Sequence, residues 1–163
     1  MTRTPPRVLV VASTDRRRGA EVFSERLRDG LAGRGWPVDA VALVSGGDGP
    51  TVSLEHLTDS APAAVGRLSP AILTALRRRI MESRPDVVVA NGGATLRYAA
   101  LAVVGSGARL AYVAIGEPNY WLRSSLAQRL NRALLGRPDL VLSVSEATRR
   151  QLAELRPGVA DRT

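Results

Sequence analysis

The stretch VLVVASTDRRRGAEVFSERLRDGLAGRGWPVDAVAL, residues 8–43, decides the fold because a strand pattern, a helix pattern and a second strand pattern follow one another in it. The runs RVLVVAS (7–13) and PVDAVALV (37–44) are short, rich in valine and almost continuously apolar, which is typical of strands buried on both faces of a parallel sheet. Between them a helix is predicted to begin at Gly19 and to end in GRGWP. The apolar residues expected to face the sheet are Val22, Phe23, Leu27 and Leu31.

The rest of the chain repeats this alternation. Three further apolar runs predict strands: PDVVVAN (85–91), ARLAYVAIG (108–116) and PDLVLSVS (138–145). Helices are predicted at four places: behind Ser69 and Pro70, over TLRYAALAVVG (95–105), over a leucine row in 121–135, and behind Ser145 and Glu146. This order predicts a single α/β domain with a doubly wound, mostly parallel sheet. Only residues 45–68 lack a clear period, and TVSLEHL could form a short strand there.

Length and composition limit the class of protein. A chain of 163 residues fits one domain with an ordinary core. It contains no cysteine, which excludes disulfides and is compatible with a reducing cytoplasm. His56 is the only histidine and has no carboxylates at ligand spacing, so no metal is predicted and His56 is interpreted as incidental. Without a membrane-length apolar run or a signal-peptide pattern, we expect a cytoplasmic protein.

The net charge of +8 comes entirely from an excess of arginine, since the chain has no lysine. A positive field favours anionic partners, such as phosphates or an anionic membrane surface, so a peripheral location at the inner membrane face stays open. Nucleic acid is not a favoured partner, because the basic residues are scattered and aromatic residues are few.

Candidate site residues follow from the rule that doubly wound sheets bind ligands beyond the carboxyl ends of their strands. In the first such turn, STDRRRGAE (13–21) has one glycine, so it lacks the three-glycine dinucleotide motif, and it does not match a P-loop. An anion could still bind at the helix N-terminus beside Arg16, Arg17 and Arg18, or the arginines could form an ordinary solvated loop. The other edge residues are Ser13, Asn91, Gly92, Gly93, Gly116, Glu117, Asn119, Tyr120 and Ser145.

Two of these edges carry distinct chemistry. The glycines of NGGA (91–94) would let a ligand approach the backbone closely, or would form a tight turn. In IGEPNYW (115–121), Glu117 could act as a base or accept hydrogen bonds from substrate hydroxyls, and Tyr120 offers a flat face to a sugar ring. Alternatively, Glu117 caps the next helix and the aromatic residues pack in the core.

The order and spacing of these motifs resemble the N-terminal domain of GT-B glycosyltransferases of the family-4 type. Residues 8–43 look like that family's first strand, its Gly-Gly-Ala-Glu loop and the following helix. RPDVVVANGGATLRYAALA (84–102) and RPDLVLSVSEATRRQL (137–152) are similar to two later family segments. Two positions depart from the family: its first loop glycine is Arg18, and a histidine found in many members is Gly116.

The resemblance implies a Rossmann-like acceptor domain over residues 1–155 and the start of a linker at 156–163, leading to a C-terminal donor domain absent from this chain. It places Arg18 and Gly19 at the donor diphosphate and Glu117 at a catalytic position. The complete enzyme is expected to transfer a hexose from a nucleotide sugar, a co-substrate, to a sugar or lipid-linked acceptor with retention of configuration, using no metal or other cofactor.

Because the donor domain is missing, we expect little turnover by this chain alone, and its standing as an enzyme stays open. Two alternatives also remain. One is a non-catalytic basic interaction domain that docks on a membrane surface or a partner chain, and the other is a small nucleotide-binding protein.

Overall fold

A computed structural model describes residues 4–115, 133–155 and 158. The strands are β1 (Val8–Thr14), β2 (Val38–Val44), β3 (Glu55–Thr58), β4 (Val87–Asn91), β5 (Arg109–Ala114) and β6 (Leu140–Ser143). The helices are α1 (Gly19–Ala32), α2 (Pro70–Ser83), α3 (Gly93–Ala102) and α5 (Glu146–Leu155), with a 3₁₀ helix η1 (Pro62–Gly66). The five predicted strands are confirmed, and β3 is the short strand expected around TVSLEHL (51–57), of which it overlaps the end.

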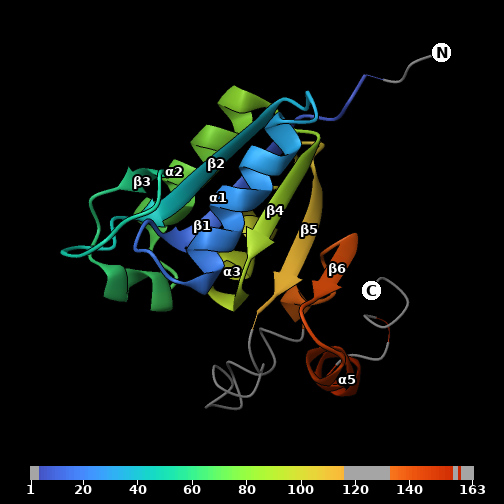
Figure 1. Ribbon diagram of the computed structural model, residues 1–163. Helices are drawn as coiled ribbons and strands as arrows, with labels where there is room; N and C mark the ends of the chain where they lie inside the picture. Colours follow the sequence, from blue (N-terminus) through green and yellow to red (C-terminus); the bar gives the residue numbers. More distant parts are fainter. Residues whose placement is uncertain (1–3, 116–132, 156–157, 159–163) are drawn as a thin grey trace.

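The strands form one sheet in the order β3-β2-β1-β4-β5-β6, and every neighbouring pair is parallel. Figure 1 shows α1 on one face of this sheet and α2 and α3 on the other. The predicted doubly wound α/β domain is therefore confirmed. Because β2 and β4 lie on opposite sides of β1, the direction of winding changes between β1 and β4.

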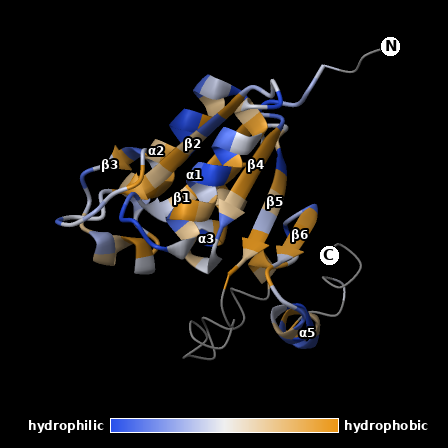
Figure 2. Ribbon diagram, viewed as in Figure 1, coloured by the Kyte–Doolittle hydropathy of each residue, from blue (hydrophilic) through white to orange (hydrophobic). Residues whose placement is uncertain are grey.

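Apolar side chains on both faces of the central strands form the core, which Figure 2 shows as the hydrophobic colouring of these strands. On the face covered by α2, the residues Ile72, Leu76 and Ile80 are fully buried, as the helical period predicts. Each such side chain contributes about 1.5–3 kcal/mol by leaving water. No helix among the described residues is long and apolar enough to cross a membrane.

The prediction for α1 is wrong at one residue. Val22, Leu27 and Leu31 pack against the core, but Phe23 is 39% exposed. The buried residues of α1 are the polar Glu21 and Ser24. These two side chains occupy the surface of α1 that meets the strand ends, so Phe23 is left at the outside.

Candidate functional site

All strands end at the same edge of the sheet, which lies at the bottom of Figure 1. The change in winding between β1 and β4 places their ends, Thr14 and Asn91, at the crevice where doubly wound folds bind ligands. The predicted residues Ser13, Arg18, Gly19 and Asn91 come together here.

Asn91 connects the end of β4 to the first turns of α1. Its Nδ2 atom donates hydrogen bonds to the carbonyl oxygen of Ala20, at 2.5 Å, and to the Oγ atom of Ser24, at 2.7 Å. The side chain is buried, and its Oδ1 atom has no partner within the described part of the chain. Asn91 therefore fixes the N-terminal part of α1 against the sheet.

Glu21 makes the second connection between the sheet and α1. Its Oε1 atom accepts hydrogen bonds from the hydroxyls of Ser13, at 3.2 Å, and Thr14, at 3.5 Å. Glu21 is only 3% exposed and lies in the first turn of α1, where the helix dipole stabilises a negative charge. The Ser13 hydroxyl, predicted to line the cleft, is thus engaged with Glu21.

Residues 15–18, called the arginine loop below, join β1 to α1. Arg16, Arg17 and Arg18 are all exposed, and within the described residues their side chains have no hydrogen bond or ion pair. Arg18 is the N-cap of α1, but its side chain makes no capping bond. Since the first N–H groups of a helix have no acceptor within it, this end presents free donors beside three unpaired cations.

The remaining described candidates lie further along the same edge. Gly92 has φ of +96° and precedes α3, which begins at Gly93, so the tight turn requires glycine at position 92. Ser145 caps α5 as predicted, with its Oγ atom accepting the Thr148 N–H at 3.1 Å. Ser145 follows β6, three strands away from β1, or about 14 Å at the usual strand spacing.

Because of this separation, Ser145 cannot contact the same ligand atom as Ser13. The neighbouring Glu146 has its pKa lowered to about 2, chiefly by the hydrogen bond from Arg149. This pair is an exposed contact within α5 and has no connection with the β1–β4 crevice.

Gly116, Glu117, Asn119 and Tyr120 lie outside the described residues, as does most of the predicted helix at 121–135. Its described end includes Leu134, which is buried. β5 ends at Ala114, at the carboxyl edge of the sheet, and Ile115 is the last residue described before position 116.

Sequence reasoning missed the surroundings of His56. Its Nδ1 atom lies 3.6 Å from the Oδ2 atom of Asp15, and its Nε2 atom lies 3.2 Å from the Oδ1 atom of Asp59. Asp59 lies three residues after His56, so this contact could have been expected from the sequence. Nothing in the sequence pairs His56 with Asp15. In the described part of the chain no group of three or more His, Cys, Asp or Glu residues could hold a metal ion.

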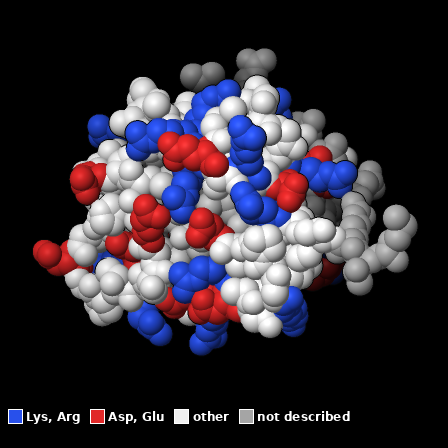
Figure 3. Space-filling model, turned by 90° about the horizontal axis from the view of Figure 1, so that it is seen from above, with Lys and Arg blue, Asp and Glu red and all other residues white. Residues whose placement is uncertain are grey.

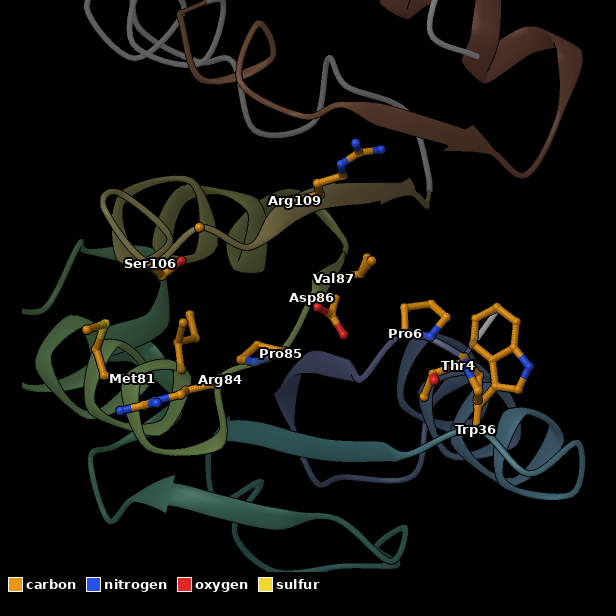
Figure 4. A pocket seen from close by; sticks show the side chains of 13 residues that line it. Thr4, Pro6, Trp36, Met81, Arg84, Pro85, Asp86, Val87, Ser106 and Arg109 are labelled. Carbon is orange, nitrogen blue, oxygen red and sulfur yellow. The ribbon is translucent and has the colours of Figure 1, made fainter. Parts of the chain in front are cut away.

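A hollow of about 1070 Å³ lies at the opposite edge of the sheet, where the strands begin. Figure 4 shows Trp36 and Pro6 on one side of it and Met81 on the other, while the guanidinium groups of Arg84 and Arg109 point away. Asp86 points into the hollow, but its Oδ2 atom accepts the Arg7 N–H at 2.7 Å. The hollow is large but offers few unengaged polar groups to a ligand.

Charges at this edge are mixed, as Figure 3 shows in a view onto it. Arg79 pairs with Asp39 at 2.9 Å and with Glu55 at 3.4 Å. The arginine loop, in contrast, has no paired carboxylate on its guanidinium groups within the described residues. The carboxyl edge, where these arginines lie beside a helix N-terminus, is therefore the better candidate site for an anion.

Comparison with solved structures shows a shared fold. The chain is similar to Anabaena Alr3699/HepE in complex with UDP-glucose, with a TM-score of 0.68 and 20% identity over 97% of this chain and 42% of that chain. It is also similar to UDP-N-acetylglucosamine 2-epimerase from Rickettsia bellii, with a TM-score of 0.65 and 12% identity over 97% of this chain and 44% of that one. The chain thus spans less than half the length of these neighbours, which have the GT-B type of Rossmann-like fold.

A search of curated proteins gives no match. The model of the family described as "Glycosyl transferase 4-like domain" matches residues 18–163, which include α1, the Asn91 turn and α5. The chain therefore belongs to the glycosyl transferase 4-like domain family.

Proposed function

We propose that this chain is the acceptor-side half of a nucleotide-sugar-dependent glycosyltransferase that transfers a hexose to an acceptor hydroxyl with retention of configuration. The single observation that carries the proposal is the start of α1 beside the ends of β1 and β4, where arginines without a partner among the described residues lie next to the first N–H groups of the helix. Family membership supports the reaction class, and the arrangement supports an anionic group as the ligand.

In this proposal the arginine loop faces the diphosphate of the donor. Positive charge and backbone N–H groups stabilise the negative charge that develops on a departing diphosphate. Arg18 stands where a glycine would allow the backbone to approach the diphosphate more closely, so its guanidinium group takes over part of that contact. The N–H group of Gly19, the first residue of α1, is the adjacent backbone donor.

The groups that bind the nucleoside belong, in this proposal, to a second domain in the same polypeptide or in another subunit. The chain's coverage of 42–44% of its structural neighbours supports that division. Acceptor contacts are assigned to Asn91, Gly92, Gly93, Gly116, Asn119, Tyr120 and Ser145, and the catalytic carboxylate to Glu117. The described residues among them, Asn91, Gly92, Gly93 and Ser145, lie at the carboxyl edge of the sheet.

Isothermal titration calorimetry of this chain with UDP-glucose, uridine and inorganic pyrophosphate tests the proposal. Pyrophosphate is expected to bind weakly, with uridine showing no heat and UDP-glucose gaining nothing over pyrophosphate, because the nucleoside-binding groups are in the other domain. Binding of uridine or UDP-glucose with a Kd of about 10 µM or lower, roughly 7 kcal/mol, would instead identify a small nucleotide-binding protein.

A further inference from the structure

Asp15, at the start of the arginine loop, contacts three residues that are distant from it in sequence. Its Oδ1 atom accepts the Gly46 N–H at 2.5 Å, and its carbonyl oxygen accepts the Val52 N–H at 2.8 Å. Its Oδ2 atom lies 3.6 Å from the His56 Nδ1 atom. One residue thus joins the β1–α1 connection to residues 46–52 and to β3.

Residues 46–52 lie directly against the arginine loop. Arg16 and Thr51 form an antiparallel bridge, and the Arg17 N–H donates to the carbonyl oxygen of Pro50 at 2.8 Å. A Cβ atom at Gly46 would collide with the backbone and Cβ atom of Arg16. This close approach of two backbones is therefore available only to glycine at position 46.

Asp15 is the more protected of the two carboxylates that face His56. Its side chain is 12% exposed, whereas that of Asp59 is 99% exposed. Water screens the contact with Asp59 far more than the contact with Asp15. The Asp15 carboxylate is thus held from one side by a backbone N–H group and from the other by the imidazole.

We propose that Asp15 and His56 are positioning residues, which hold the backbone of the arginine loop so that Arg17, Arg18 and the free N–H groups of α1 face the crevice. Neither residue is placed on the ligand. This inference deepens the proposed function and rests on it for its biological meaning, but the order of the loop can be measured without any ligand.

Limited digestion with trypsin measures how well ordered the arginine loop is, because the loop contains three consecutive arginines at which the enzyme can cleave. Mass spectrometry separates cleavage after Arg16, Arg17 and Arg18 from cleavage elsewhere, and the exposed Arg34, in the turn before β2 at the opposite edge, provides an internal reference. Loss of a hydrogen bond to a charged group is expected to increase cleavage of the loop about tenfold in Asp15→Ala. Asp15→Asn keeps an acceptor for Gly46 and should retain much of the protection, and His56→Ala should fall between Asp15→Asn and Asp15→Ala.

A matched glycine pair controls for loss of folding. Gly46→Ala introduces the collision with Arg16 and should increase loop cleavage as Asp15→Ala does. Gly66→Ala meets nothing within 4 Å and should be cleaved like the unchanged protein. Equal loop cleavage in the unchanged protein, Asp15→Ala and Gly46→Ala, each normalised to cleavage after Arg34, would overturn the positioning role.

Protection from trypsin by pyrophosphate distinguishes a failure of this inference from a failure of the proposed function. If the arginine loop binds a diphosphate, pyrophosphate should protect the loop of the unchanged protein from trypsin and should protect Asp15→Ala about tenfold less effectively at the same concentration. Faster cleavage of Asp15→Ala without any protection by pyrophosphate would support the positioning role and reject the diphosphate site. Equal protection of both proteins would reject the positioning role alone.

Discussion

The two edges of the sheet differ in how their polar groups are hydrogen-bonded. At the edge where strands begin, the repeated triplet RPD, at 84–86 and 137–139, places a carboxylate on the first N–H groups of the neighbouring strand. Asp86 accepts the Arg7 N–H at 2.7 Å, and Asp139 accepts the Leu110 N–H at 2.8 Å. The backbone N–H groups of Arg7 and Leu110 at this edge are thus hydrogen-bonded within the protein.

At the opposite edge, polar groups are only partly satisfied. Asn91 and Glu21 bind the first turns of α1 to the sheet, but among the described residues the guanidinium groups of the arginine loop have no partner. The hollow of about 1070 Å³ lies at the edge where the strands begin. Three consecutive arginines beside a helix N-terminus therefore mark the better candidate site, since the guanidinium groups of Arg84 and Arg109 point away from the hollow.

The largest loss of stability is expected from a substitution at Asn91, which connects the carboxyl edge to α1. In Asn91→Asp a carboxylate oxygen would face the carbonyl oxygen of Ala20, which now lies 2.5 Å from the amide nitrogen. We expect a loss of about 3 kcal/mol in the free energy of unfolding, from two lost donors and the repulsion of two buried oxygens. Urea denaturation measures this change.

Asn91→Ala removes the same hydrogen bonds without adding charge, and should lose about 1–2 kcal/mol. If Asn91→Asp is no less stable than Asn91→Ala, the contact between Asn91 and Ala20 is not the one described.

A smaller effect is expected at the edge where the strands begin. Asp139→Ala leaves the Leu110 N–H without its acceptor and should lower the free energy of unfolding by about 1 kcal/mol. It should not change pyrophosphate affinity, because Asp139 lies at the far end of the strands. Thermal unfolding measures the change in stability, and calorimetry measures the affinity for pyrophosphate. Glu154 is exposed, so Glu154→Ala is the control for loss of one negative charge.

If Asp139→Ala changed the affinity and Glu154→Ala did not, the two edges would not be independent, contrary to the comparison drawn above.

Much of the fold could be predicted from the sequence, because five of the six strands lie in short apolar runs that alternate with helical patterns. The apolar pattern failed where a buried surface is polar: Ser24 and Glu21 face the strand ends, and Phe23 does not. A rule about strand ends predicted the edge that carries Ser13, Gly19 and Asn91.

The contacts within that edge could not be predicted. Asp15 and His56 are 41 residues apart, and Ser24 and Asn91 are 67 apart, so only the order of strands in the sheet brings them together. A single histidine without nearby ligands carries no local signal of its partner across the sheet.

The central claim is that the arginine loop, and not the hollow where the strands begin, binds an anion. It is tested most directly by calorimetry with inorganic pyrophosphate on two double variants of equal charge. Arg17→Gln with Arg18→Gln should weaken pyrophosphate binding about tenfold, since two charge-assisted contacts are lost. Arg84→Gln with Arg109→Gln should bind like the unchanged protein; an equal loss in both variants, or a loss only in the second, would contradict the account.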